Sequence, residues 1–123
     1  MRTEMFIKSY RADAAIAKHR IVVAGAADAS VAQAAAATGA IMGVNASLAA
    51  TTGQVTDVIV GGYATVEYGG NVTRGAPLTS DGSGRAIVAT TAGQRLIGFA
   101  VLAGASGDLG TVDVRLGFMA VAP

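Results

Sequence analysis

The sequence lacks cysteine and tryptophan, and its 123 residues include only two prolines, three phenylalanines and three tyrosines. Without cysteine, neither a disulfide nor a thiolate metal site can form. The formal net charge is +1, from nine basic and eight acidic residues. Such a balance gives no field strong enough to gather nucleic acid or anionic lipid. We therefore expect no nucleic-acid partner.

Small residues are abundant instead: 17 glycines stand beside many alanines, valines and threonines. This composition is typical of a β-rich protein with few large side chains to fill its core. Small side chains each bury little apolar area, and burial stabilises by about 25 cal/mol per Å². A monomer should therefore be only modestly stable, and self-association would bury more surface. The length fits a single domain.

Residues 29–56 carry no charge, which could suggest a membrane span. The stretch is, however, mostly alanine, glycine, serine and threonine, and it contains Gln33, Asn45 and Gln54. A spanning helix needs about 20 predominantly apolar residues. We therefore expect a buried β segment here and no membrane partner.

A loose internal repeat relates residues 20–61 to residues 74–117. Each copy begins at an arginine, continues to an apolar segment that ends at Gly43 or Gly98, and closes with an aspartate-led strand. The spacings differ by single residues, which turns tolerate and packed strands do not. We interpret the copies as two similar β units within one domain, residues 19–123.

Residues 1–18 stand apart from this repeat and hold six of the 17 charged residues. They contain the apolar and aromatic stretch Met-Phe-Ile-Lys-Ser-Tyr at positions 5–10. This segment is either an extended N-terminal arm or the first strand of the sheet, because Phe6 and Tyr10 are large enough to anchor a core.

Strand signals recur along the chain every eight to twelve residues, with glycine at the joints. We expect an all-β fold, a small Gly/Ala-rich β-sandwich or barrel. Gly61 and Gly62 should separate two strands, 55–60 and 63–68. Residues 31–38 are ambiguous: their alanines favour a helix, whereas the β-branched counterpart at 85–91 favours a strand. We prefer the strand.

No reactive constellation emerges from the sequence. His19 is the only histidine and has no nearby carboxylate to orient it, and a triad with Ser106 and Asp108 would lack a nucleophile elbow. No carboxylates or histidines have metal-ligand spacing. The glycines at 61–62 and 82–84 fit hairpin turns better than phosphate loops. We expect no catalytic, cofactor-binding or metal-binding residue, and no enzyme.

The second copy carries a family resemblance. It runs Arg-Gly-Ala-Pro-Leu-Thr-Ser-Asp-Gly-Ser-Gly-Arg-Ala-Ile-Val-Ala from residue 74, then Leu-Ile-Gly-Phe-Ala-Val, then Ala-Ser-Gly-Asp-Leu-Gly-Thr-Val-Asp-Val-Arg-Leu. In its order of elements it resembles the capsid cement, or head decoration, proteins of tailed bacteriophages. The resemblance covers the second half well, the first half through the repeat, and residues 1–18 poorly.

The resemblance implies a non-enzymatic protein on the outer surface of the virion head. Such proteins are commonly homotrimers that clamp neighbouring subunits of the major capsid protein. We hypothesise that the N-terminal arm adds a strand to a sheet edge of a capsid subunit, with contacts from Met5, Phe6, Ile7, Lys8 and Tyr10. The alternative is an oligomeric β module that binds carbohydrate or a cell surface, on a phage tail or cell envelope.

Overall fold

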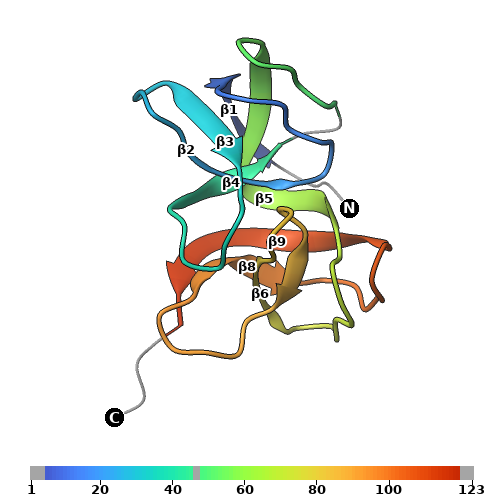
Figure 1. The fold of residues 1–123 in the computed structure, drawn as a ribbon. Helices are drawn as coiled ribbons and strands as arrows, with labels where there is room; N and C mark the ends of the chain where they lie inside the picture. Colours follow the sequence, from blue (N-terminus) through green and yellow to red (C-terminus); the bar gives the residue numbers. More distant parts are fainter. Residues whose placement is uncertain (1–4, 46–47, 120–123) are drawn as a thin grey trace.

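The structure is a computed structural model that describes residues 5–45 and 48–119. The described residues form nine β-strands and no helix (Figure 1). The strands are β1 (Met5–Ala12), β2 (Ile21–Ala24), β3 (Ser30–Gln33), β4 (Ile41–Asn45), β5 (Val55–Glu67), β6 (Pro77–Ser80), β7 (Ala86–Val88), β8 (Arg95–Ala100) and β9 (Leu109–Phe118). The all-β prediction is confirmed.

The first five strands close into a barrel in the order β1-β3-β2-β4-β5, because β5 also pairs with β1. Only β1 and β3 run parallel; the other neighbours in the ring are antiparallel. Four outer strands continue the sheet from β5 in the order β9-β8-β6-β7. Of the two predicted architectures, sandwich or barrel, the structure therefore has the barrel.

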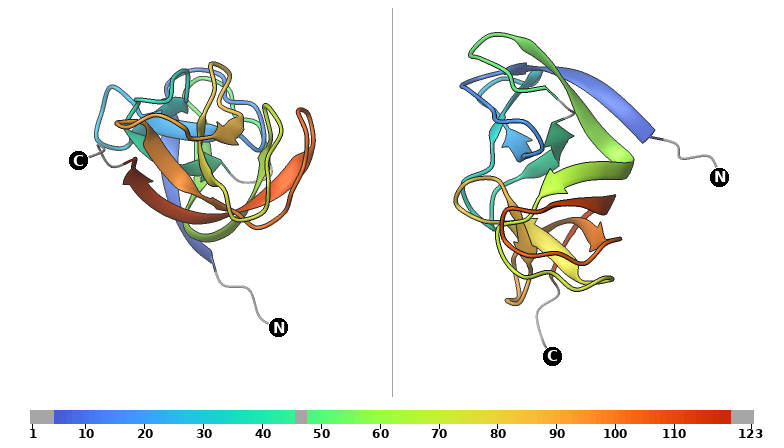
Figure 2. Two further views of the ribbon diagram at one scale, coloured as in Figure 1. Left: turned by 90° about the horizontal axis from the view of Figure 1, so that it is seen from below. Right: turned by 90° about the vertical axis from the view of Figure 1, so that its right-hand side faces the viewer.

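Strand β5 links the barrel to the outer strands (Figure 2). Residues 55–62 pair with β1, and residues 62–67 pair with β9. The prediction that Gly61 and Gly62 end a strand is wrong, because β5 runs through both. Gly62 has a φ of 85°, a conformation that glycine adopts without steric penalty. Gly61 lies against the Phe6 ring, which would contact any added Cβ. The glycine pair therefore redirects the strand without interrupting it.

The strand order is the same on either side of the β5–β9 pair. It reads β5-β4-β2-β3 in one direction and β9-β8-β6-β7 in the other. We call β1–β4 with residues 55–60 the first unit, and residues 61–67 with β6–β9 the second unit. Ile16 and Ala50 exchange two backbone hydrogen bonds of 2.9 Å in the first unit; Val72 and Gly104 exchange bonds of 2.8 and 3.0 Å in the second. The boundaries of the sequence repeat, 20–61 and 74–117, stay a prediction.

Residues 31–38 form neither a helix nor a full strand. Strand β3 ends at Gln33, and a turn follows before β4 begins at Ile41. Ala34 is buried, and its amide donates to the Ile21 carbonyl at 2.9 Å, which extends the pairing with β2 and takes the amide away from any helical hydrogen bond. Tertiary contacts thus override the helix propensity of the alanines.

The core is built from small and β-branched side chains in two clusters. The larger cluster extends through both units, from Ile21 in the first to Val112 in the second, and includes Tyr68. The smaller cluster lies in the first unit and contains Tyr10, Ile16 and Val58. Because the larger cluster continues across β5, the two units share one interior.

Candidate interaction surfaces

Strand β1 carries the exposed part of the predicted contact segment. Phe6 is 68% exposed and Ile7 51% exposed, and Lys8 is also exposed. Strand β1 pairs with β5 from Met5 to Arg11. On its other edge, β3 pairs only with Arg11 and Ala12. Among the described residues, no strand therefore covers the second edge of β1 before Arg11.

Tyr10, also a predicted contact residue, is buried in the core. Its side chain is only 7% exposed and packs in the smaller core cluster. Lys8 places its Nζ 5.4 Å from the centroid of the Tyr10 ring, close enough for a cation–π attraction. Tyr10 thus anchors β1 in the barrel, and the side chain of Met5 lies outside the described part. The exposed candidates are Phe6, Ile7 and Lys8.

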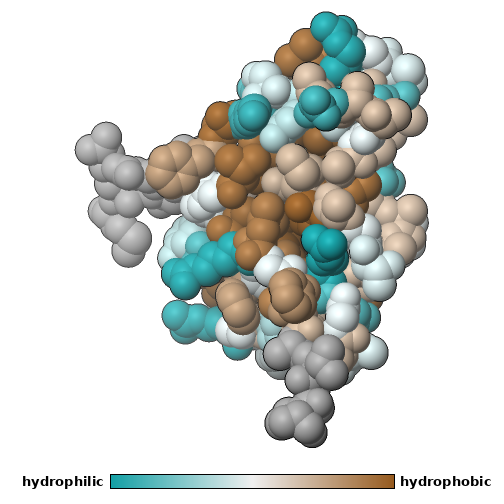
Figure 3. All heavy atoms as spheres, turned by 90° about the vertical axis from the view of Figure 1, so that its left-hand side faces the viewer, coloured by the Kyte–Doolittle hydropathy of each residue, from teal (hydrophilic) through white to brown (hydrophobic). Residues whose placement is uncertain are grey.

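A second apolar surface lies where the end of β9 passes β4. Figure 3 shows the face on which β9 ends, with hydrophobic residues gathered across its middle. A groove of about 300 Å³ opens there, lined by Ile41, Arg95, Leu96, Leu116, Gly117 and Phe118. Phe118 is 68% exposed. Sequence reasoning missed this surface, because the alternation Val112, Val114, Leu116, Phe118 is typical of a buried face.

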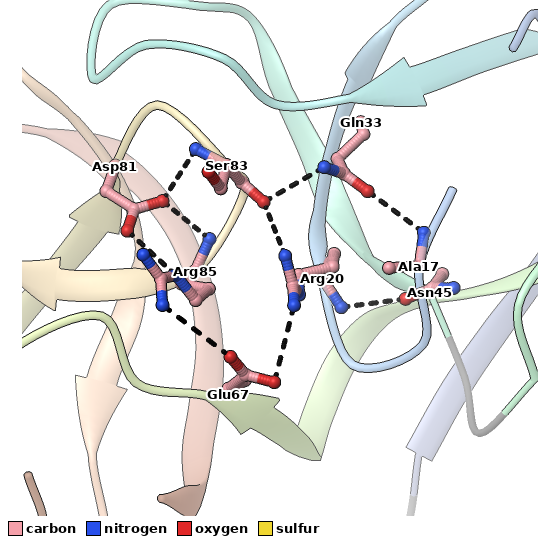
Figure 4. Close-up of polar contacts among 8 residues, drawn as sticks. All are labelled: Ala17, Arg20, Gln33, Asn45, Glu67, Asp81, Ser83 and Arg85. Carbon is pink, nitrogen blue, oxygen red and sulfur yellow. Dashed lines mark hydrogen bonds and ion pairs between the residues drawn. The ribbon is translucent and has the colours of Figure 1, made fainter. Parts of the chain in front are cut away.

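A polar cluster joins the two units around Glu67 (Figure 4). Arg20 of the first unit places Nη2 3.3 Å from Glu67 Oε1, and Arg85 of the second unit places Nη1 3.8 Å from Oε2. Arg85 Nε also lies 3.2 Å from Asp81 Oδ2. These side chains are largely shielded from water, so their attraction is less screened than that of a surface pair.

Backbone groups complete the polar cluster. The carbonyl of Ser83 accepts hydrogen bonds from Arg20 Nη1 (2.9 Å) and Gln33 Nε2 (3.0 Å). The Arg20 amide donates to Asn45 Oδ1 at 2.8 Å, and the Ala17 amide donates to Gln33 Oε1 at 2.9 Å. Arg20 Nε is buried without a hydrogen-bond partner among the described residues. The cluster holds the units together.

Replacing Glu67 with alanine should destabilise the protein by about 1–3 kcal/mol, because two partly buried arginines lose their shared carboxylate. Thermal and urea unfolding measure the change. Asp113→Ala is the matched control, because it breaks an ion pair whose Arg115 side chain is exposed and should cost less than about 1 kcal/mol. Equal losses in the two variants would contradict a special role for Glu67.

The residues considered for catalysis have local structural roles. His19 has a φ of 60°, and its carbonyl accepts the Glu67 amide at 3.0 Å. Asp108 Oδ2 accepts the Ala105 amide at 2.8 Å in the turn that also contains Ser106. No hydrogen bond links His19, Ser106 and Asp108 within residues 5–45 and 48–119. Asp81 Oδ1 accepts the amides of the hairpin between β6 and β7.

Two further features are absent from the described part of the chain. No three histidine, cysteine, aspartate or glutamate side chains gather there as metal ligands would. No helix in that part is long and apolar enough to cross a membrane.

Comparison with known proteins supports a structural role. No curated protein matches the sequence. A solved structure described as the head fiber gp8.5 N base in bacteriophage phi29 has a similar fold, with a TM-score of 0.68 and 21% sequence identity. The alignment covers 91% of this chain and 95% of that chain. Residues 3–116 match the model of a family described as phage cement protein. The resemblance seen in the sequence is thus confirmed, and the chain belongs to the phage cement protein family, a structural and non-enzymatic family.

Proposed function

We propose that this protein binds the outer surface of the phage head and stabilises the shell by bridging neighbouring subunits of the major capsid protein. A ligand that binds only the assembled shell shifts the equilibrium away from disassembly. Many modest contacts add through multivalency, and no reactive group is needed. The homotrimer is part of this proposal, because three linked copies can hold several capsid subunits at once.

The open edge of β1 is the observation that carries the proposal. It combines backbone groups without a described strand partner and exposed apolar side chains at Phe6 and Ile7. An extended segment of a capsid subunit can pair with such an edge through main-chain hydrogen bonds. Since β1 is held by β5 along its length, the edge is presented by a fixed strand. Phe6, Ile7 and Lys8 are the proposed contact residues.

The structural neighbour offers separate support. Its description places it in a head fibre of a phage. The same arrangement of strands therefore occurs in a second head-associated protein. We extend attachment to the head from that protein to this chain as part of the proposal. The binding of carbohydrate or a cell surface, the alternative, is not favoured by any contact described above.

The double substitution F6A/I7A should weaken binding to phage heads that lack this protein by roughly tenfold or more. Truncating two exposed apolar anchors of an interface costs upwards of about 1 kcal/mol each when they are central to it, and 1.4 kcal/mol corresponds to a factor of ten. Co-sedimentation with purified heads over a range of protein concentrations measures the change.

Leu102→Ala is the matched control for this experiment, because Leu102 is 51% exposed like Ile7 but follows β8 in the second unit. L102A should bind heads as the unchanged protein does, and thermal unfolding should show that all variants are folded. Normal binding by F6A/I7A would reject β1 as the contact. Hits on a glycan array, with no binding to heads, would favour the carbohydrate-binding alternative.

A further inference from the structure

The last four residues of β9 extend beyond its partner β5. Strand β9 pairs with β5 from Leu109 to Val114, whereas β8 accompanies it to Phe118. On the β5 side, no described strand pairs with β9 after Val114. The pairing of β8 with β9 is irregular between Val114 and Gly117, and beyond this irregularity Leu116 and Phe118 are both exposed. We call residues 115–118 the β9 overhang.

The two units have equivalent strand orders, so positions on β9 have equivalent positions on β5. The strand that covers the equivalent part of β5 shows how such a place is covered within one chain. The bridges Ile16–Ala50 and Val72–Gly104 put Ala50 and Gly104, which are 54 positions apart, at equivalent points before β5 and β9. Phe118 and Ala64 are also 54 positions apart. Ala64 is only 3% exposed, because β5 continues into the second unit, where β9 pairs with it. Phe118, at the end of the second unit, is 68% exposed.

The overhang also forms one wall of the groove. Leu116 and Phe118 line it together with Ile41 of β4 and Leu96 of β8. The groove thus combines apolar side chains and Arg95 with a strand edge that has no described partner. Exposed apolar side chains beside an open edge favour association with another chain.

We propose that the groove and the β9 overhang are the self-association surface, covered by a second copy of this chain. The equivalent part of β5 is covered by β9 of the second unit, which has the same strand order as the first. The overhang also lies on a different side of the molecule from the start of β1, the edge proposed for the shell (Figures 1 and 2). One copy can therefore contact a sister copy and a capsid subunit at once. This inference rests on the self-association within the proposed function.

Sedimentation velocity of the purified protein tests the proposal in solution. The unchanged protein should form oligomers as its concentration rises, and L116A/F118A should dissociate at concentrations about tenfold higher or more. L102A removes a comparable exposed leucine outside the groove and should associate normally. Circular dichroism should show that L116A/F118A is folded, because both side chains are exposed in the single chain. Unchanged association in L116A/F118A overturns the proposal.

A cysteine substitution tests the same contact on phage heads, since the natural chain has no cysteine. Gly117 accepts a side chain, because an added Cβ would meet nothing within 4 Å. G117C labelled with a benzophenone maleimide should photo-cross-link to a second copy on decorated heads, whereas labelled G70C, at a glycine outside the groove, should not. Absence of G117C cross-links, both on heads and in solution, also overturns the proposal.

The two proposals fail in different ways. If L116A/F118A loses self-association while the unchanged protein does not bind heads, the capsid function fails and the self-association surface stands. If F6A/I7A loses head binding while L116A/F118A associates normally, the capsid contact stands and the self-association surface fails.

Discussion

Replacing Gly98 with alanine should lower the free energy of unfolding by about 3 kcal/mol or more. A Cβ at this position would overlap the backbone carbonyl of Asp113 in the neighbouring β9. A backbone atom within a paired sheet cannot move aside as a flexible side chain can. Overpacking ordinarily costs about 1–3 kcal/mol and occasionally more, and this overlap belongs at the upper end.

Gly43 holds the corresponding place in the first unit, where an added Cβ would overlap the Ile59 carbonyl. Both glycines lie at irregularities of strand pairing, Gly43 against β2 and Gly98 against β9. Single-domain proteins have about 5–15 kcal/mol of stability, so the double variant G43A/G98A should fail to fold.

Circular dichroism during thermal unfolding measures these effects, and G98A should melt about 10 °C or more below the unchanged protein. Gly70→Ala is the control, because its added Cβ would make only an ordinary contact of 3.8 Å with Ile87. If G98A melted together with G70A, the close approach of β8 and β9 at Gly98 would be wrong.

Tyr68→Ala should lower the free energy of unfolding by about 3–5 kcal/mol, because removing a large buried ring leaves a cavity. Tyr68 is fully buried, and an added Cβ at Gly110 would overlap its ring. Its hydroxyl donates to the Leu102 carbonyl at 2.6 Å. Tyr68→Phe keeps the ring and should lose only about 1–2 kcal/mol. Tyr63→Phe, at an exposed tyrosine, should be neutral within about 0.5 kcal/mol.

The contribution of Tyr68 should also depend on pH. Burial raises the pKa of Tyr68 above its usual 10.0, opposed in part by a hydrogen bond from the Thr111 backbone. The folded state thus favours the neutral phenol, so this contribution is present below about pH 10 and is lost as pH rises through the folded pKa. Urea unfolding between about pH 8 and 11 should show the gap between the unchanged protein and Y68F narrowing above pH 10. A constant gap would contradict the raised pKa.

Local features of the fold were predictable from the sequence. The hairpin turn at residues 82–84 was predicted, because glycine-rich turn residues act over a few positions. Strand β5 was not, because its path through Gly61 and Gly62 depends on Phe6 and on β9, which are distant in the sequence. The helix-or-strand question at residues 31–38 likewise depended on tertiary contacts.

The candidate surfaces were predictable to different degrees. The exposed apolar stretch at Phe6 and Ile7 was noticed in the sequence because it precedes the repeat and includes aromatic residues. The same reasoning gave Tyr10 a surface role, whereas the barrel buries it. Leu116 and Phe118 could not be distinguished from core residues, because apolar alternation predicts a buried face and does not show where the neighbouring strand ends.

The sequence by itself determined the all-β class, because glycine, alanine and β-branched residues at short spacing favour hairpins over long helices. It also determined the family, through the order of its motifs, and the lack of cysteine chemistry. Only the tertiary structure decided which strands meet. Closure of the barrel joins β1 to β5 across more than 40 positions, and such pairings depend on the register of whole strands. That register buries Tyr10 and exposes Phe6 and Phe118, and it thereby sets the surfaces available to other chains.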